Sequence, residues 1–413
     1  MVNAVAWNGL RGHTWSELGT WADLLSGGEV PPDPPAEPDF GPPVWYIADL
    51  LTGKTLFTLL EVRCKASDVI GQYTSTTATI PIVTDTTSPV YLTRRQVEDL
   101  TDPRWRRVLV RVAAGVPMWA GIITGRKGGT ESTLSLSVTT LRVYLDMRVV
   151  QDHDFVGADD STIGRALVGD ANVEGINIIV DAPPTGIKRD RTYRRKDNAS
   201  VHKRLGELSD VEGGSETHVF VRWMPDRSGF LFVLELRPQI GVTESGEVAT
   251  FTARPTYGTT TGTEATYTLT EDCGREAFAN YVVATGDGQG DAQPESAPAR
   301  SAALDAGEEP RIERRFNPSS GIVEIETLNA HARADLARDE HGSELWEIVA
   351  RADVTPIYGL DWRIGQYIRA ELTGHRHPPT GPEAAPKPGV VLEGVRAMGW
   401  DLSEDGTKLT PKW

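Results

Sequence analysis

Two histidine pairs in this 413-residue sequence have the residue type that binds transition metals. His375-Arg376-His377 would place two imidazoles on one side of an extended strand, but no third ligand lies nearby and two prolines follow. His331 and His341 do not have the spacing of a helical zinc pair. The favoured interpretation of His375–His377 is a solvated loop, and no metal site is predicted.

Gly286-Asp287-Gly288-Gln289-Gly290 has the glycine content of a loop that cradles a phosphate. Such a loop needs a helix directly after it, whose first amides face the anion. Pro294 and Pro298 follow instead, so we predict a plain loop. The sequence also contains no nucleophile motif, no Cys–His pair and no recognisable pair of carboxylates. We therefore predict no enzyme and no cofactor, although two carboxylates that meet only in the fold remain an open alternative.

Basic residues gather between positions 188 and 204. Three interpretations are open: a solvated face, which we favour, a contact with acidic neighbours, or a contact with the phosphates of passing DNA. Only Tyr193 is interleaved among them, so stacking on single-stranded nucleic acid has little support. The cluster comprises Lys188, Arg189, Arg191, Arg194, Arg195, Lys196, Lys203 and Arg204.

The composition excludes several classes of protein. With 58 acidic and 42 basic residues the formal net charge is -16, which disfavours sequence-specific binding to nucleic acid. No apolar run approaches the roughly 20 residues that span a bilayer, and the N-terminus lacks the pattern of a secretory signal. Cys64 and Cys273 are far apart, and we interpret both as unreactive small hydrophobic residues in a reducing compartment.

Residues 1–43 form a separate arm in the predicted organisation. Thr14-Trp15-Ser16-Glu17 has the spacing of a capping box, and apolar residues then recur at intervals of three and four. A proline-rich linker follows between residues 31 and 43. A short helix on such a tether must dock either on its own chain or on a neighbour. The candidate docking residues are Trp7, Trp15, Leu18, Trp21, Leu24 and Leu25.

The rest of the chain is predicted to be mainly β with a few short helices, in three domains. Residues 44–150 read as a small barrel or sandwich, residues 151–275 as a mixed α/β domain, and residues 276–413 as a second β domain containing a mobile loop at 286–310. Expected strands are 55–60, 75–82, 107–112, 118–124, 134–138, 217–223, 229–236, 346–350 and 390–400. Expected helices are 161–168, 199–208 with Asn198 as the N-cap, and 328–338.

Several of these stretches resemble a known family. They are Val44–Gly53, Pro117–Arg126, Leu141–Arg148, Asn280–Gly290 and Asp361–Leu372. Their residues resemble the minor tail proteins of siphophages that infect actinobacteria, which are similar to the baseplate or tail-tip hub proteins of tailed phages. The arm at 1–43 lies outside the resemblance.

The resemblance implies a structural virion protein with two small β-barrel, tube-like domains per chain. Three chains would form a homotrimeric, six-lobed ring at the tail tip that joins the sixfold tail tube to the threefold tip. The genome would pass through its lumen without specific binding. Implied partners are the distal tail protein, the tape measure protein and other tail-tip or fibre proteins, with assembly in the host cytoplasm. The alternative is a receptor- or carbohydrate-binding tail-tip protein, since eleven Trp residues are present.

Overall fold

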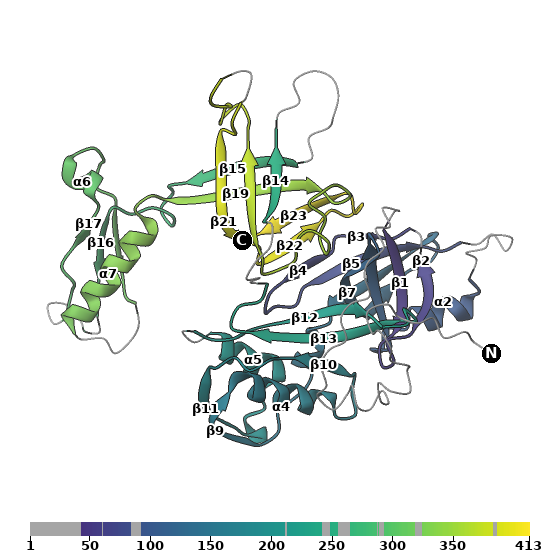
Figure 1. The fold of residues 1–413 in the computed structure, drawn as a ribbon. Helices are drawn as coiled ribbons and strands as arrows, with labels where there is room; N and C mark the ends of the chain where they lie inside the picture. Colours follow the sequence, from purple (N-terminus) through teal and green to yellow (C-terminus); the bar gives the residue numbers. More distant parts are fainter. Residues whose placement is uncertain are drawn as a thin grey trace, which may run out of the picture. The chain divides into compact units, whose positions relative to one another are not determined.

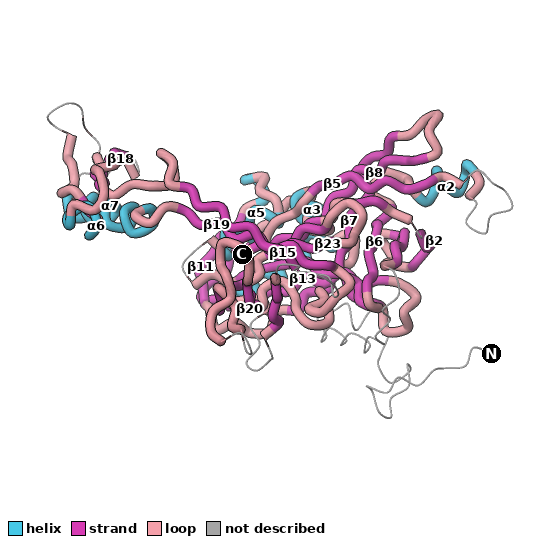
Figure 2. The backbone as a smooth tube through the Cα atoms, turned by 90° about the horizontal axis from the view of Figure 1, so that it is seen from above, coloured by secondary structure: helices cyan, strands magenta, loops and turns pink. Residues whose placement is uncertain are grey.

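The structure is a computed structural model that describes residues 43–59, 61–83, 92–210, 213–241, 248–254, 265–286, 288, 293–318, 324–382 and 386–413. The chain forms two compact units. Unit 1 contains the residues up to Thr266 together with Val349–Trp413, and unit 2 is the intervening segment Tyr267–Ile348. Strands dominate the described backbone and most helices are short (Figure 1, Figure 2).

The first large sheet of unit 1 is antiparallel, with the strand order β2-β1-β6-β7-β8-β5-β3. Alternation of apolar and polar residues along β8 buries Leu134, Leu136 and Val138, as expected for a sheet with one covered face. The short helix α2 (Arg94–Leu100) begins with a capping box between Thr93 and Gln96. The strands are β1 (Val44–Asp49), β2 (Thr55–Leu59), β3 (Arg63–Cys64), β5 (Ser75–Pro81), β6 (Arg107–Ala113), β7 (Val116–Lys127) and β8 (Thr133–Thr140).

The second large sheet has the order β21-β20-β14-β15-β19-β23-β22-β4 and draws its strands from distant parts of the chain. β15 and β19 are the strands through which the chain leads to and from unit 2. The strands are β4 (Ser67–Val69), β14 (Ala249–Ala253), β15 (Ala265–Asp272), β19 (Ser343–Arg351), β20 (Tyr367–Leu372), β21 (Val390–Arg396), β22 (Gly399–Leu402) and β23 (Lys408–Lys412).

The middle of unit 1 contains a three-stranded sheet, β10-β13-β12, a separate two-stranded antiparallel sheet, β11-β9, and several helices. Asp159 begins α4 by accepting a hydrogen bond from Ser161 N at 2.9 Å, and α4 and α5 then pack into the main core through Ile163, Leu167 and Leu205. The elements are α3 (Val143–Asp146), β9 (His153–Asp159), α4 (Asp160–Asn172), β10 (Ile178–Asp181), β11 (Lys188–Tyr193), the 3-10 turn η1 (Arg195–Asp197), α5 (Val201–Ser209), β12 (Glu216–Trp223) and β13 (Phe230–Arg237).

Unit 2 is a small α/β unit in which α7 packs against a three-stranded sheet of order β17-β16-β18. Its core is formed by Ala279, Val282, Ala284, Leu328, Ala332 and Leu336. The elements are β16 (Tyr281–Ala284), β17 (Ala299–Arg300), α6 (Ala302–Ala306), β18 (Glu313–Phe316) and α7 (Ile325–Asp339).

The prediction of a mainly β chain with short helices is confirmed, and no helix of the described residues is long and apolar enough to cross a membrane. The first sheet has β2 and β3 as its end strands, and closure of either large sheet into a barrel stays a prediction. The two units begin and end at other positions than the predicted domains, and the division at 1–43, 44–150, 151–275 and 276–413 also stays a prediction.

Two local predictions need correction. Asn198 was expected to cap the second helix, but α5 begins two residues later with Ser200, whose hydroxyl accepts from Lys203 N at 3.1 Å. Asn198 instead ends η1 in a left-handed conformation. The stretch expected as a loop at 286–310 contains β17 and α6 in its described part.

Candidate functional site: the junction of the two large sheets

The chain passes from the first large sheet to the second between β3 and β4, and it returns to the first between β4 and β5. β3 ends the first sheet at Cys64, and after only Lys65 and Ala66 the chain continues as β4, the last strand of the second sheet. β4 pairs antiparallel with β22, so that Trp400 lies opposite Asp68. We call this region, Arg63–Ile70 with Met398–Gly406, the junction.

Backbone hydrogen bonds extend along the whole junction. Cys64 N donates to Glu404 O at 3.0 Å, Leu402 N to Ala66 O at 2.8 Å, and Ile70 N to Met398 O at 2.9 Å. Since the backbone groups of both segments are satisfied in this way, separating the segments would leave buried donors and acceptors without partners. The pairing therefore fixes the second sheet to the first.

Side chains on both sides converge on Ser67 of β4. The indole of Trp119, from β7, donates to Ser67 O at 3.1 Å, and Lys412, from β23, lies 3.3 Å from the Ser67 hydroxyl. Trp119 is 1 % exposed and packs edge-on against Trp45 with ring centroids 6.0 Å apart. Trp400 is fully buried on the opposite side of the junction. Large rings therefore fill the junction from both sheets.

A buried guanidinium adds a second link between the sheets. Arg111, on β6, is 2 % exposed, donates to Gly406 O at 3.1 Å and lies 6.0 Å from the ring centroid of Trp45. Burial lowers the pKa of Arg111 to about 10, and burial raises the pKa of the nearby Cys64 thiol to about 12. At neutral pH the guanidinium is therefore charged and the thiol is protonated, so Cys64 is unreactive as predicted.

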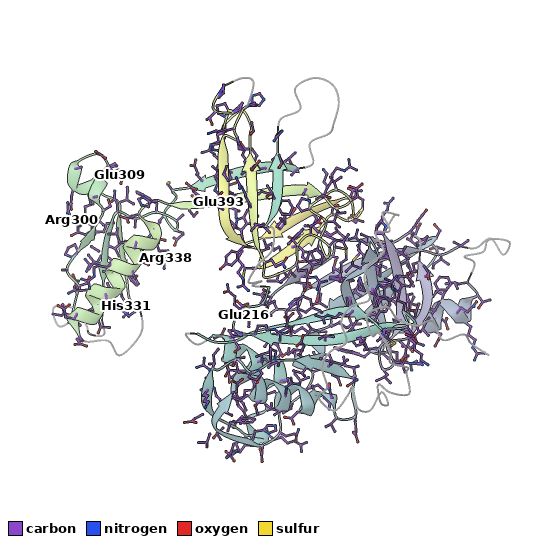
Figure 3. All side chains as sticks on the ribbon, in the orientation of Figure 1. Glu216, Arg300, Glu309, His331, Arg338 and Glu393 are labelled. Atoms are coloured by element: carbon purple, nitrogen blue, oxygen red, sulfur yellow. The ribbon has the colours of Figure 1, made fainter. Side chains whose placement is uncertain are left out.

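A charged clamp joins the second sheet to the middle of unit 1. Arg396, at the end of β21, meets Glu216 in a two-pronged ion pair with N–O distances of 2.6 and 2.5 Å. The same guanidinium donates to Ile240 O at 2.7 Å and to Gly365 O at 2.8 Å. Glu216 stands at the start of β12 (Figure 3). The ion pair is part-buried, and the N–H groups of the guanidinium are all engaged in hydrogen bonds. The pair therefore restricts the relative position of β12 and β21.

A second buried arginine organises the helices beside β12. Arg142 donates to Thr217 O at 3.0 Å and to His202 Nδ1 at 3.0 Å, and burial lowers its pKa to about 10. Burial and the charge of Arg142 lower the pKa of His202, although Asp146 opposes this shift. His202 therefore acts here as a neutral acceptor that holds the arginine in place.

A polar cavity of about 200 Å³ opens beside the junction and is lined by Asp68, Trp119, Phe220, Tyr358 and others. The Asp68 carboxylate lies 3.1 Å from His218 Nε2. Among the described residues no hydroxyl or thiol hydrogen-bonds to His218, and no three acidic, His or Cys side chains are grouped to hold a metal ion. The arrangement supplies shape and fixed polar contacts, without a recognisable nucleophile.

The motifs singled out in the sequence lie away from the junction. His375 is exposed, in agreement with the loop interpretation, and Cys273 is also exposed, so its interpretation as an unreactive residue stays a prediction. After the Gly286–Gly290 turn, the described residues 293–301 form no helix, in agreement with the predicted loop. The candidate docking residues Trp7, Trp15, Leu18, Trp21, Leu24 and Leu25 lie outside the described residues.

The basic cluster is divided between solvent and acidic partners. Lys188, Arg195, Lys196 and Lys203 are exposed, in agreement with a solvated face. Arg194 instead pairs with Asp154 at 2.6 Å, and Arg189 with the buried Asp160 at 3.3 Å. Arg204 pairs with Asp197 and Glu207. Acidic residues of the same chain thus neutralise part of the cluster.

Sequence reasoning missed the junction residues Ser67–Val69, Arg111, Glu216 and Arg396. β4 is only three residues long and has no apolar pattern. Arg111 gave a partial signal, since it stands between Val110 and Val112 in a strand whose neighbours are all buried. The identity of its partner, 295 positions further along the chain, could not be read from that pattern.

Comparison with known proteins finds similar solved structures but no matching sequence family. No family model matches the chain, and no curated protein matches it. A tail protein from Neisseria meningitidis MC58 is similar at 16% identity, covering 89% of this chain and 95% of the other, with a TM-score of 0.47. The 43 kDa tail protein of prophage MuSo2 from Shewanella oneidensis shares 11% identity over 89% of this chain and 97% of its own, with a TM-score of 0.48. A prophage tail protein from Listeria monocytogenes EGD-e shares 11% identity over 90% and 94%, with a TM-score of 0.39.

Proposed function

We propose that this chain is a structural component of a phage tail tip, a hub that forms a homotrimeric ring between the sixfold tail tube and a threefold tip. The observation that carries the proposal is the crossing at β4, which fuses two large β-sheets into one unit of a single chain. The sequence resemblance of Val44–Gly53 and Asp361–Leu372 to hub-type minor tail proteins supplies the family context.

The geometry suits a change of symmetry. Each chain presents two β-lobes, which we define as the first and second sheets, so three chains present six lobes to a sixfold tube. A closed ring leaves no free interface for further growth. The two lobes must keep a fixed relative position for this task, and the Arg111–Gly406 contact together with the backbone bonds of the junction supplies that restraint. Barrel closure of each lobe is part of this proposal.

The net charge suits passage of a genome. A formal charge of -16 disfavours adhesion of phosphates to the surface, so DNA would pass through the lumen of the ring without specific binding. The proposed neighbours are the distal tail protein, the tape measure protein and other tail-tip or fibre proteins. We propose no enzymatic role and no cofactor, and assembly of the tail in the host cytoplasm.

The alternative function, receptor or carbohydrate binding, would use exposed tryptophans as stacking surfaces. Trp45, Trp119, Trp362 and Trp400 are each at most 4% exposed and serve packing instead. Surface Trp→Ala changes that abolish binding of host cell-wall polysaccharide would favour the alternative.

Light scattering of the purified full-length chain, combined with antibody labelling of intact tails, tests the proposal. We expect a trimer, or a monomer that becomes trimeric with its tail neighbours, and label confined to the tail tip. A chain that is monomeric both in solution and in the particle, or label along the tail tube, would contradict it.

A further inference from the structure

An apolar groove of about 200 Å³ lies between α2 and the strands β2 and β5 of the first sheet. Phe57 and Leu59 line one wall, and Val97 and Leu100 of α2 line the other. α2 contains no fully buried residue, although its N-terminus is closed by a complete capping box. The helix therefore stands over the sheet with its apolar side incompletely covered.

The size of the groove fits one large aromatic side chain. A cavity of roughly 150 Å³ lined by aliphatic residues accepts a benzene-sized ring, and this groove is somewhat larger. Ile82 and Leu92 also line it, and the polar lining is limited to Thr58, Glu61 and Thr101, so an inserted ring would meet mainly hydrocarbon. Burying such a ring is favourable in proportion to the apolar area removed from water.

The segment of the chain that precedes β1 contains aromatic residues. Residues 1–42 precede β1, and Trp45, the second residue of β1, lies opposite Leu59 of the groove wall. The arm therefore joins the body beside the groove. With about 3.1 Å per residue in an extended proline-rich linker, residues 26–43 reach roughly 55 Å. A tether of this kind gives an effective concentration on the order of millimolar.

We infer that the segment Thr14–Leu25 docks in this groove of its own chain, with the Trp21 ring inserted and Leu18 and Leu25 on the rim. The sequence predicts a helix there, in which residues three before and four after Trp21 lie on the same face. Docking would cover the apolar side of α2 and bury the stripe that the arm cannot bury alone. The inference does not depend on the proposed function in a tail.

Hydrogen exchange of the full-length chain, read by mass spectrometry, tests the docking. In the wild type we expect residues 14–25 to exchange at least tenfold more slowly than an unfolded peptide. Val97→Lys should remove that protection, whereas Leu51→Lys, at a site 64% exposed and outside the groove, should leave it unchanged. An unprotected segment, or protection that survives Val97→Lys, would overturn the inference.

A reciprocal variant separates docking from damage to α2. Trp21→Lys leaves α2 chemically intact, and we expect it both to remove protection from residues 14–25 and to speed exchange in residues 94–100 at least threefold. Unchanged exchange in α2 would contradict the inference.

Cross-linking identifies the occupant. A photoreactive benzoylphenylalanine in place of Phe57 should attach to residues 14–25, and in a mixture of isotopically light and heavy chains the joined peptides should carry the same label. Mixed labels would mean a second copy, and attachment to residues 84–91, which connect Val83 to Leu92, would mean a local occupant. Either result would overturn the inference.

Discussion

The hydrophobic cores of units 1 and 2 differ in the size of the side chains that form them. The main core of unit 1 joins one face of several strands to helices and includes large side chains such as Phe230 and Phe232. Among the described residues, the core of unit 2 has six buried members, of which Ala279, Ala284 and Ala332 are alanines. Alanines bury little apolar area, so unit 2 gains much less from the hydrophobic effect.

Charged contacts also hold α7 to the sheet of unit 2. Arg314 of β18 lies 3.4 Å from Asp335 and also pairs with Asp339, and both aspartates come from α7. Arg338 contacts the same two carboxylates. In unit 1 the buried Arg111 and Arg142 donate to carbonyl groups, whereas the buried Arg107 pairs with Asp49. Because its core buries less apolar area, we expect unit 2 to unfold at lower cost than unit 1.

Trp119→Ala should have the largest effect and should act on unit 1 alone. It removes a ring that is 1% exposed and the hydrogen bond to Ser67 O. We expect the free energy of unfolding of unit 1 to fall by about 4 kcal/mol. Urea denaturation followed by hydrogen exchange would measure each unit separately. Leu51→Ala is the exposed control, and an equal loss of protection in unit 2 would contradict the separation of the units.

Leu328→Ala should act on unit 2 alone. The side chain is fully buried between α7 and the three-stranded sheet, and its loss should cost about 3 kcal/mol. Because the core is small, we expect amides of unit 2 to exchange freely while those of the first sheet stay protected. Ile325→Ala, on the same helix and 53% exposed, is the matched control. Cooperative unfolding of both units would show that they are one body.

The elements around Trp119 and Leu328 also show which parts of the fold the sequence could predict. Alternation in β8 and the long apolar run in β7 were visible as strands, and the spacing of Leu328, Ala332 and Leu336 was visible as a helix face. The pairing of β4 with β22 was not visible, because three residues carry no period and their partner lies 330 positions away.

The sequence analysis also missed short elements that have no clear hydrophobic pattern. α6 lies in an Ala/Pro/Glu-rich stretch that read as a mobile loop, yet Ser301 accepts from Leu304 N at its start and Gly307 ends it in a left-handed conformation. Ser301 and Gly307 are an N-cap and C-cap signal that could have found it. At the junction, Arg111 stands between two valines of β6. This pattern indicated a buried partner but not which residue the partner is.

Gly399→Ala should have an intermediate effect on the junction. A Cβ atom at this position would lie 2.4 Å from Asp68 O, so β4 and β22 would have to separate. We expect a loss of about 2 kcal/mol in unit 1, measured by urea denaturation. Gly169→Ala, on α4 with open space around its Cβ, is the control and should be neutral or stabilising. Equal stability of the Gly399 variant and wild type would mean that the β4–β22 pairing does not hold the sheets.

The smallest predicted effect is a pH dependence confined to unit 1. Since the pKa of His202 is lowered in the folded chain, the unfolded chain binds a proton at a higher pH than the folded one does. The free energy of unfolding should therefore be highest above the unfolded pKa of about 6.5 and should fall as the pH drops below it. His202→Gln keeps an acceptor for Arg142 and should flatten this dependence between pH 7.5 and 5.5 in urea denaturation. An unchanged slope in the variant would contradict the assignment.

A symmetry-resolved image of the assembled tail tip tests the central claim most directly. We expect three copies of the chain in one ring, with the two sheets of each copy in the same relative position as the β4 crossing gives them and six lobes facing the tail tube. A tail tip in which this chain occurs once, or in which its two sheets are separated and belong to different layers, would contradict the account.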